Sequence, residues 1–221
     1  MTIHRPGLPG DLPDPELLWA RWALNAVVRA TTAEEDRGGH RTGVWSDDEG
    51  LHLDDCGCTW WTFSRITEGR YVLYGEDESS GCKWHEPPVD MLAGGPGWLP
   101  YEELRDRLSG YELGCVYWYE DGAWARAAYP GDLADDGLDC GMSRFAERAE
   151  ALGLLADHVA YDGGAAELLM AAAEERRLTP ELLAAHVVAE DRGDPDLPAM
   201  VRALRRTGLG GQVAAAGQLQ A

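Results

Sequence analysis

Metal-ligating side chains gather in one region of this 221-residue chain. Cys56 and Cys58 are separated by a single glycine, His52 precedes them, and Cys82 and His85 follow. Structural zinc sites usually use Cys-x₂₋₄-Cys pairs, because that spacing lets both thiolates reach one tetrahedral ion. The Cys-x-Cys spacing is tighter than this, whereas Cys82 and His85 have a spacing that suits a shared ion. The sequence therefore leaves Cys82 and His85 as candidate zinc ligands, with buried or loop cysteines as the alternative.

Paired carboxylates are the second feature with potential chemistry. They occur at Asp47-Asp48, Asp54-Asp55, Asp77-Glu78 and Asp135-Asp136. These pairs lie in predicted turns, where contact with solvent is their simplest role. Convergence on Ca²⁺ or Mg²⁺ is the alternative, although the spacing of an EF-hand loop is absent. The sequence thus predicts no cofactor, with zinc and calcium as the ions to test.

Support for catalysis is weak. Cys82, His85 and Glu86 have the residue types of a nucleophilic site, but their neighbours are acidic and would not stabilise a thiolate. The chain has no G-x-S-x-G motif and no P-loop. An enzyme, or a small-ligand- or metal-binding protein, remains the alternative interpretation. Its pocket would lie between a sheet and an insertion over residues 75–110.

The stretch from Cys115 to Tyr129 predicts a β-hairpin that organises the rest of the chain. Both arms are rich in β-branched and aromatic residues, and Asp121-Gly122 between them suits a two-residue turn with positive φ. Because side chains alternate across a strand, the hairpin has two distinct faces. One face carries Val116, Trp118, Ala125 and Ala127, and the other carries Tyr117, Tyr119, Trp124 and Arg126. The second face is expected either to lie under a helix or to meet a partner.

Other short strands precede this hairpin. They are predicted at Val44-Trp45, Leu51–Leu53, Thr59–Ile66 and Tyr71–Tyr74, and they are joined by acidic turns that contain glycine. Together with the hairpin they predict an α+β fold with an antiparallel meander of about six strands. The insertion is expected to contain one short helix, from Tyr101 to Leu108, where apolar residues recur at helical spacing.

The chain divides into four predicted parts. Residues 1–13 hold three prolines and two glycines and are expected to form a flexible tail. Residues 14–140 form the sheet domain, which opens with a helix capped by Asp14 and packed on the sheet. Residues 141–209 form a helical subdomain whose first helix begins near Ser143. Thr179-Pro180 is expected to begin a later helix, and Gly208 is expected to end the last one. Residues 210–221 are expected to be a frayed tail.

Charge narrows the choice of partner. The formal net charge is −20, and residues 31–140 contain 24 acidic and 8 basic residues. Such a surface repels phosphate, so nucleic acid and anionic membranes are poor partners. The chain has no apolar run of membrane-spanning length and no basic, apolar leader at its start. A cytoplasmic protein is therefore expected.

The leading functional hypothesis is a non-catalytic protein-interaction module that binds a basic protein partner. The anchors would be aromatic side chains on the second hairpin face and on the predicted strand Thr59–Ile66, with acidic residues at the rim that steer encounter. The residues assigned to this surface are Trp61, Tyr117, Tyr119, Trp124 and Arg126, with Glu76, Asp77 and Glu78 as the rim. Immunity and antitoxin-like proteins share this composition and class, but no motif in the chain assigns it to a family.

Overall fold

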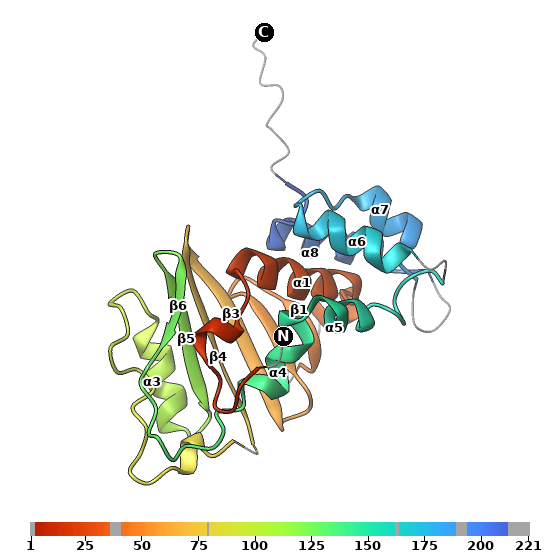
Figure 1. Cartoon of the computed structure of the whole chain (residues 1–221). Coiled ribbons are helices and arrows are strands. Elements are labelled where there is room, and N and C mark those ends of the chain that lie inside the picture. Colours follow the sequence, from red (N-terminus) through yellow and green to blue (C-terminus); the bar gives the residue numbers. More distant parts are fainter. Residues whose placement is uncertain (1–2, 36–40, 79, 162–163, 189–193, 212–221) are drawn as a thin grey trace.

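The computed structural model describes residues 3–35, 41–78, 80–161, 164–188 and 194–211. It is an α+β protein in which helices cover both faces of one sheet (Figure 1). The strands are β1 (Gly43–Ser46), β2 (Leu51–Asp54), β3 (Thr59–Thr67), β4 (Arg70–Asp77), β5 (Cys115–Glu120) and β6 (Ala123–Arg126). The helices are α1 (Pro15–Val28), α2 (Thr32–Glu35), α3 (Tyr101–Ser109), α4 (Leu138–Ala146), α5 (Arg148–Gly153), α6 (Ala165–Glu174), α7 (Pro180–His186) and α8 (Leu197–Thr207), with 3₁₀ turns η1 (Pro9–Asp11) and η2 (Cys82–Trp84). Within the described part of the chain, no helix combines the length and apolarity that crossing a bilayer requires.

The six strands form one antiparallel meander in chain order, as the sequence predicts. The β5–β6 hairpin has the expected register, with Tyr117 opposite Arg126 and Tyr119 opposite Trp124. At its turn the φ angles of Asp121 and Gly122 are 54° and 83°. Both lie in the left-handed region that Gly and Asp tolerate best, so this turn follows from its local sequence.

One face of the sheet lies under α1 and α4. Trp22 of α1 stacks on Phe145 of α4 with ring centroids 4.7 Å apart and packs on Phe63 of β3 at 6.1 Å. Close approach of α4 to β3 depends on Gly141, where an ideal Cβ would lie 2.1 Å from Nε1 of Trp61. These contacts place a dense aromatic core between the sheet and the two helices.

The same core encloses the aromatic hairpin face that the sequence offered as a partner surface. Tyr117 and Trp61 have no exposed surface, while Tyr119 and Trp124 are half-buried against the core. The indole of Trp124 donates to the carbonyl oxygen of Pro13 at 2.7 Å. The hairpin face is therefore covered, but by the N-terminal segment and its turn η1 and not by α1 or α4. Each large aromatic side chain gains from burying about 150–250 Å². Trp61 and Tyr117 cannot act as surface anchors in this structure.

The insertion covers the opposite face, over β4 and β5. Leu104 of α3 is fully buried among Val72, Tyr74, Val116 and other residues of a second core. In Figure 1, α3 lies on the side of the sheet away from α1. The short helix predicted in the insertion is thus confirmed, and it explains why the β5 strand is apolar on both faces.

The C-terminal helices share the first core instead of building their own. Helices α6 and α8 pack on α1, on its side away from the sheet (Figure 1). Arg21 of α1 crosses this boundary, since its Nε lies 2.9 Å from Oε1 of Glu174 on α6 and its Nη1 2.6 Å from the carbonyl oxygen of Ala146. Buried side chains of the sheet, α1 and the C-terminal helices form one cluster. The residues before and after position 140 therefore share one hydrophobic core.

The C-terminal helix ends only partly match the prediction. Helix α4 begins at Leu138, and Ser143 lies inside it, donating its hydroxyl to a backbone carbonyl of the preceding turn at 2.7 Å. Extended backbone at Glu147 separates α4 from α5. The Thr179 cap and the Gly208 stop are confirmed: the Thr179 hydroxyl accepts a backbone N–H at 3.2 Å, and Gly208 has φ of 70°.

The N-terminal segment is packed against the sheet, contrary to the expected flexible tail. The Asp11 carboxylate accepts two backbone N–H groups of the segment at 2.7 and 2.9 Å. The buried Asp136 carboxylate accepts the Gly7 N–H at 2.9 Å and the Tyr117 hydroxyl at 2.7 Å. Asp11 and Asp136 thus supply hydrogen-bond acceptors for backbone N–H groups of this segment. The content of proline and glycine, on which the expectation of a flexible tail is based, does not indicate such contacts. Residues 1–2 and most of the predicted frayed tail, from 212 onward, lie outside the described residues.

Candidate binding surface between the sheet and the insertion

A pocket of about 440 Å³ lies between the sheet and the insertion. Trp45 of β1 and Trp60 of β3 contribute its aromatic lining, while Arg107 of α3 and the following Glu112 contribute charged groups. Glu76 of β4 lines it from the sheet. Most of its lining residues belong to β1 to β4 and α3, and none belongs to the segment that holds Cys82 and His85.

A polar chain from the sheet to α3 orders one wall of this pocket. The Arg107 guanidinium lies 4.6 Å from the ring centroid of Trp60, and its Nε lies 3.1 Å from Oε1 of Glu103. The same oxygen accepts the Tyr74 hydroxyl at 2.6 Å. Burial raises the pKa of the Tyr74 hydroxyl, and the Glu103 carboxylate raises it further, so this phenol stays a donor. Tyr74 thus holds Glu103, which in turn holds Arg107 over Trp60.

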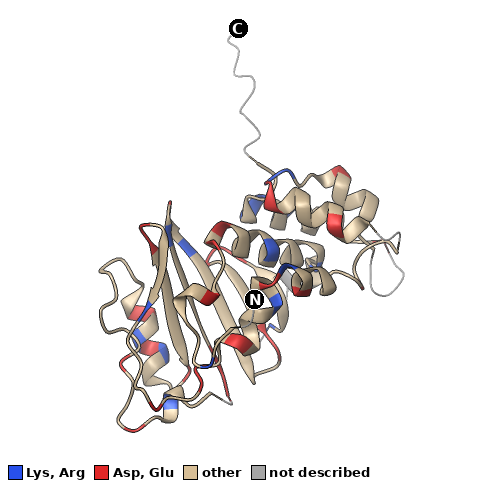
Figure 2. Ribbon diagram, in the orientation of Figure 1, with Lys and Arg blue, Asp and Glu red and all other residues tan. Residues whose placement is uncertain are grey.

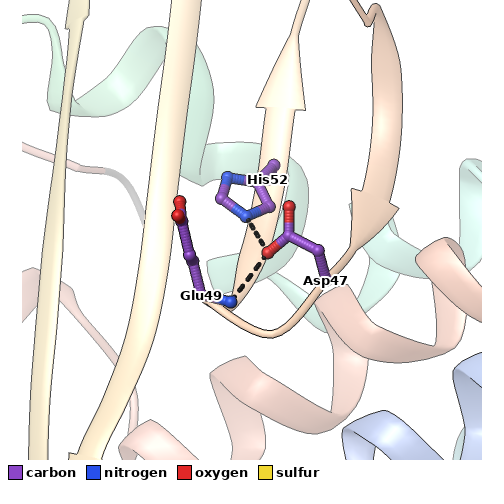
Figure 3. A group of neighbouring side chains, drawn as sticks. All are labelled: Asp47, Glu49 and His52. Atoms are coloured by element: carbon purple, nitrogen blue, oxygen red, sulfur yellow. Dashed lines mark hydrogen bonds and ion pairs between the residues drawn. The ribbon is translucent and has the colours of Figure 1, made fainter. Parts of the chain in front are cut away.

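His52 of β2 is fixed at another part of the pocket lining. Its ring stacks on Trp45 at 5.1 Å with 16° between the planes. Nδ1 lies 3.1 Å from Oγ1 of Thr62, and Nε2 lies 2.8 Å from Oδ1 of Asp47 (Figure 3). Partial burial would raise the pKa of Asp47, but hydrogen bonds from His52 and the backbone N–H groups of the turn lower it to about 2. Asp47 is therefore charged at neutral pH, and the Nε2 proton is directed at it.

The order carboxylate, imidazole and hydroxyl is that of a hydrolytic triad, but the hydroxyl is enclosed. Thr62 is 3% exposed, whereas a nucleophile must reach its substrate. The hydroxyl instead orients the His52 ring. The sequence contained a signal for part of this arrangement, because a hairpin pairing β1 with β2 brings Asp47 beside His52. Thr62 lies on the third strand and is placed beside His52 by the β2–β3 register.

Two exposed aromatic side chains lie next to the pocket. Trp84 of η2 and Tyr111 are 65% and 63% exposed, and their rings stack 5.9 Å apart at 15°. Lys83 joins this Trp84–Tyr111 stack to the sheet, since its Nζ lies 3.0 Å from Oε2 of Glu76 and 3.4 Å from the carbonyl oxygen of Tyr111. Glu76 also lines the pocket, so Lys83 links the stack to a residue of the pocket wall. Sequence reasoning missed both aromatic residues, which lie outside its predicted strands and helix.

The predicted acidic rim is only partly open. Glu76 is buried and paired with Lys83, and Asp77 is buried and accepts the Thr59 hydroxyl at 2.6 Å. Both belong to β4, which runs three residues past its predicted end at Tyr74. Glu78 is exposed. Of the three rim residues, Glu78 alone is therefore placed to meet a partner in solution.

Arg126, assigned to the aromatic docking face, has an internal role. Its Nε donates to the carbonyl oxygen of Gly7 at 2.9 Å, and its guanidinium lies 3.8 Å from the ring centroid of Tyr129. These contacts tie β6 to the N-terminal segment. Arg126 is half-buried there and does not join the pocket or the Trp84–Tyr111 stack.

Of the two predicted zinc ligands, Cys82 is a buried thiol and His85 has other partners. Cys82 is 1% exposed, and burial raises the pKa of its thiol to about 12, so it stays protonated at neutral pH. His85 has Nδ1 at 2.8 Å from the Pro87 carbonyl oxygen and Nε2 at 3.1 Å from Oδ1 of Asp132. Among the described residues, three potential ligands meet within 4.8 Å at Asp47, Glu49 and His52 instead (Figure 3).

Acidic side chains surround the pocket and the Trp84–Tyr111 stack. Glu78, Glu86, Glu112 and Asp132 are exposed. In Figure 2, acidic positions recur along the loops at the lower end of the sheet. The aromatic surface is therefore set in a negatively charged region, as the charge distribution along the chain predicts.

Comparison with known proteins adds no relative. What the chain does must be inferred from its own residues and their geometry. No protein-family model, curated protein or solved structure matches it.

Proposed function

We propose that this chain is a cytoplasmic, non-catalytic interaction protein that binds a basic protein partner, immunity- or antitoxin-like in character. The observation that carries the proposal is the exposed Trp84–Tyr111 stack beside an aromatic pocket. Because the residues around the stack are acidic, we expect the partner to be basic. This surface replaces the hairpin face on which Trp61 and Tyr117 were expected to serve as anchors.

The exposed area of the stack is large enough to matter. Two aromatic side chains that are each about two-thirds exposed offer on the order of 250 Å² together. At about 25 cal/mol per Å², covering them contributes about 6 kcal/mol before the entropic costs of association are subtracted. Trp and Tyr are also the residues most often found at the energetic centre of interfaces. Their stacking and the Lys83 contacts hold both rings in place before a partner arrives.

The charge around the stack favours a basic partner. Glu86 and Glu112 lie close in sequence to Trp84 and Tyr111, and both are exposed. Complementary charge of this kind accelerates encounter and weakens with salt, since exposed charges are screened over about 8–10 Å at physiological ionic strength. Lys83 does not cancel this charge, because it is paired with Glu76.

The test is affinity capture by the tagged full chain at low and high salt, followed by titration of the purified partner. We expect one basic protein, held more weakly at high salt. Trp84→Ala should raise its Kd by about 30-fold or more, which corresponds to about 2 kcal/mol at an interface hot spot. Glu112→Gln should mainly slow association and flatten the salt dependence.

Tyr161→Ala is the matched control, because Tyr161 is fully exposed in the segment between α5 and α6, away from the pocket. Its Kd should equal that of the unmodified chain. An acidic partner, a Tyr161→Ala variant as weak as Trp84→Ala, or no capture at either salt concentration would reject the proposal.

The pocket favours a second candidate function, the binding of a small cation. Indole faces attract cations, and Trp45 and Trp60 both line the pocket with Glu112. Arg107 lies over Trp60 and Arg41 over Trp45, so a cationic ligand would have to compete with these guanidinium groups. Suitable probes are arginine and tetramethylammonium, titrated by tryptophan fluorescence against their neutral analogues. Saturable binding of a cation that is lost in Trp60→Leu would support this candidate. Failure of both cations to bind would reject it without affecting the protein-partner proposal.

A further inference from the structure

We propose that Asp47, Glu49 and His52 form a binding site for a divalent transition-metal ion at the turn between β1 and β2. One ligand atom from each residue lies within 4.8 Å of the other two (Figure 3). Tetrahedral coordination at bond lengths of about 2.0–2.1 Å separates ligand atoms by about 3.4 Å. Glu49 is exposed, so a rotation of its side chain closes the remaining gap. The proposal does not depend on the partner binding described above.

The carboxylates have free coordinating atoms. Oδ1 of Asp47 accepts three hydrogen bonds, from His52 and from the backbone N–H groups of Glu49 and Gly50. Among the described residues, Oδ2 of Asp47 and the Glu49 carboxylate have no hydrogen-bond partner. The free oxygens of Asp47 and Glu49 therefore lie in the neighbourhood of the His52 ring (Figure 3). Nε of Arg206 lies 3.4 Å from a third acid of the turn, Asp48.

The imidazole is positioned as a metal-binding histidine is. Such a histidine binds through one ring nitrogen while the other donates to an outer partner that fixes the ring. Here the ring is clamped on Trp45, and Nδ1 faces the Thr62 hydroxyl at 3.1 Å. A hydroxyl both donates and accepts. Without an ion, Nε2 carries the ring proton and donates it to Asp47, and the Thr62 hydroxyl donates to Nδ1. When an ion binds Nε2, the ring proton lies on Nδ1, and the Thr62 hydroxyl accepts it.

The donor set indicates the class of ion. One imidazole nitrogen and two carboxylate oxygens suit Zn²⁺, Co²⁺ or Mn²⁺, whereas Mg²⁺ and Ca²⁺ prefer oxygen ligands alone. Three protein ligands leave a further position for water, as in zinc sites that are open to solvent. His52 also lines the aromatic pocket, whereas Asp47 and Glu49 line a second hollow.

The experiment titrates the metal-free full chain with Zn²⁺, Co²⁺ and Mg²⁺ by calorimetry and records the Co²⁺ absorption spectrum. We expect one Zn²⁺ or Co²⁺ per chain, weaker binding of Mg²⁺, and no thiolate-to-cobalt charge-transfer band. Glu49→Gln should weaken Zn²⁺ binding by about tenfold or more, and Thr62→Val, which removes the partner of Nδ1, should weaken it by about 10–100-fold. His52→Asn should abolish it.

Two controls separate this site from its alternatives. Asp48→Asn removes an equally acidic neighbour that is not a ligand and should leave the affinity unchanged. Cys82→Ser tests the zinc site that the sequence suggested and should also have no effect. Glu49 is exposed, so Glu49→Gln remains informative even if His52→Asn unfolds the hairpin. Absence of stoichiometric binding, equal binding by Glu49→Gln and the unmodified chain, or a thiolate band lost in Cys82→Ser would overturn the proposal.

Discussion

Gly141→Ala tests the packing that encloses Trp61. In the structure α4 rests on β3 through Gly141, and an added Cβ would lie 2.1 Å from Nε1 and 2.3 Å from Cδ1 of Trp61. Trp61 has no exposed surface and is enclosed by the core, so it cannot move aside freely. The substitution therefore forces α4 away from the sheet.

The magnitude follows from two opposing effects. Alanine gains about 1 kcal/mol over glycine from helix propensity. Overpacking a rigid core costs typically about 1–3 kcal/mol, and a separation this far below van der Waals contact places the site at or above the upper end. The net loss is expected to be about 2–3 kcal/mol in the free energy of unfolding, which for a chain of this length lowers Tm by about 4–12 °C.

Urea denaturation followed by circular dichroism, together with differential scanning calorimetry, measures the change. Gly153→Ala is the matched control, because Gly153 ends α5 with open space around its Cβ position. It should be neutral or stabilising by up to about 1 kcal/mol. Combining Gly141→Ala with Trp61→Phe, which removes the clashing pyrrole ring, should show a favourable coupling of about 1 kcal/mol or more. Equal or greater stability of Gly141→Ala would show that α4 does not rest on Trp61.

Two further predictions concern the buried polar network and the thiols. Asp136→Ala removes the acceptor of the Gly7 N–H and should lower the free energy of unfolding by about 1–3 kcal/mol. Limited proteolysis should also cleave residues 3–13 sooner than in the unmodified chain. Unchanged stability and cleavage would contradict the packing of that segment. Thiol labelling of the native protein at mildly alkaline pH should modify Cys56, which is exposed, and spare Cys82, whose pKa burial raises to about 12. Because the folded pKa of Cys82 lies above its ordinary value of 9.0, its protonated form stabilises the fold below pH 9, and this contribution is lost as the pH rises toward 12. Mass spectrometry identifies the labelled positions, and rapid native labelling of Cys82 would refute its burial.

Local sequence determined the elements of this protein. The strands, the Asp121-Gly122 turn, the Thr179 cap and the Gly208 stop were all predictable, because each depends on residues a few positions apart. Alternation along β5 also predicted which side chains share a face. It could not predict what covers each face, since that depends on where the helices and the N-terminal segment pack.

The tertiary structure decided the candidate surface. Trp84 and Tyr111 are 27 positions apart in irregular segments, and no periodic pattern marks them as a pair. His52 had a sequence-level link to Asp47 through one hairpin, but its fixed orientation comes from Thr62 on the next strand and from the stacked Trp45. The composition of residues 3–13 predicted a loose tail, yet Asp136, more than a hundred positions away, binds it to the sheet. Burial, pairing and exposure of these groups depend on contacts between distant residues, which chain order does not specify.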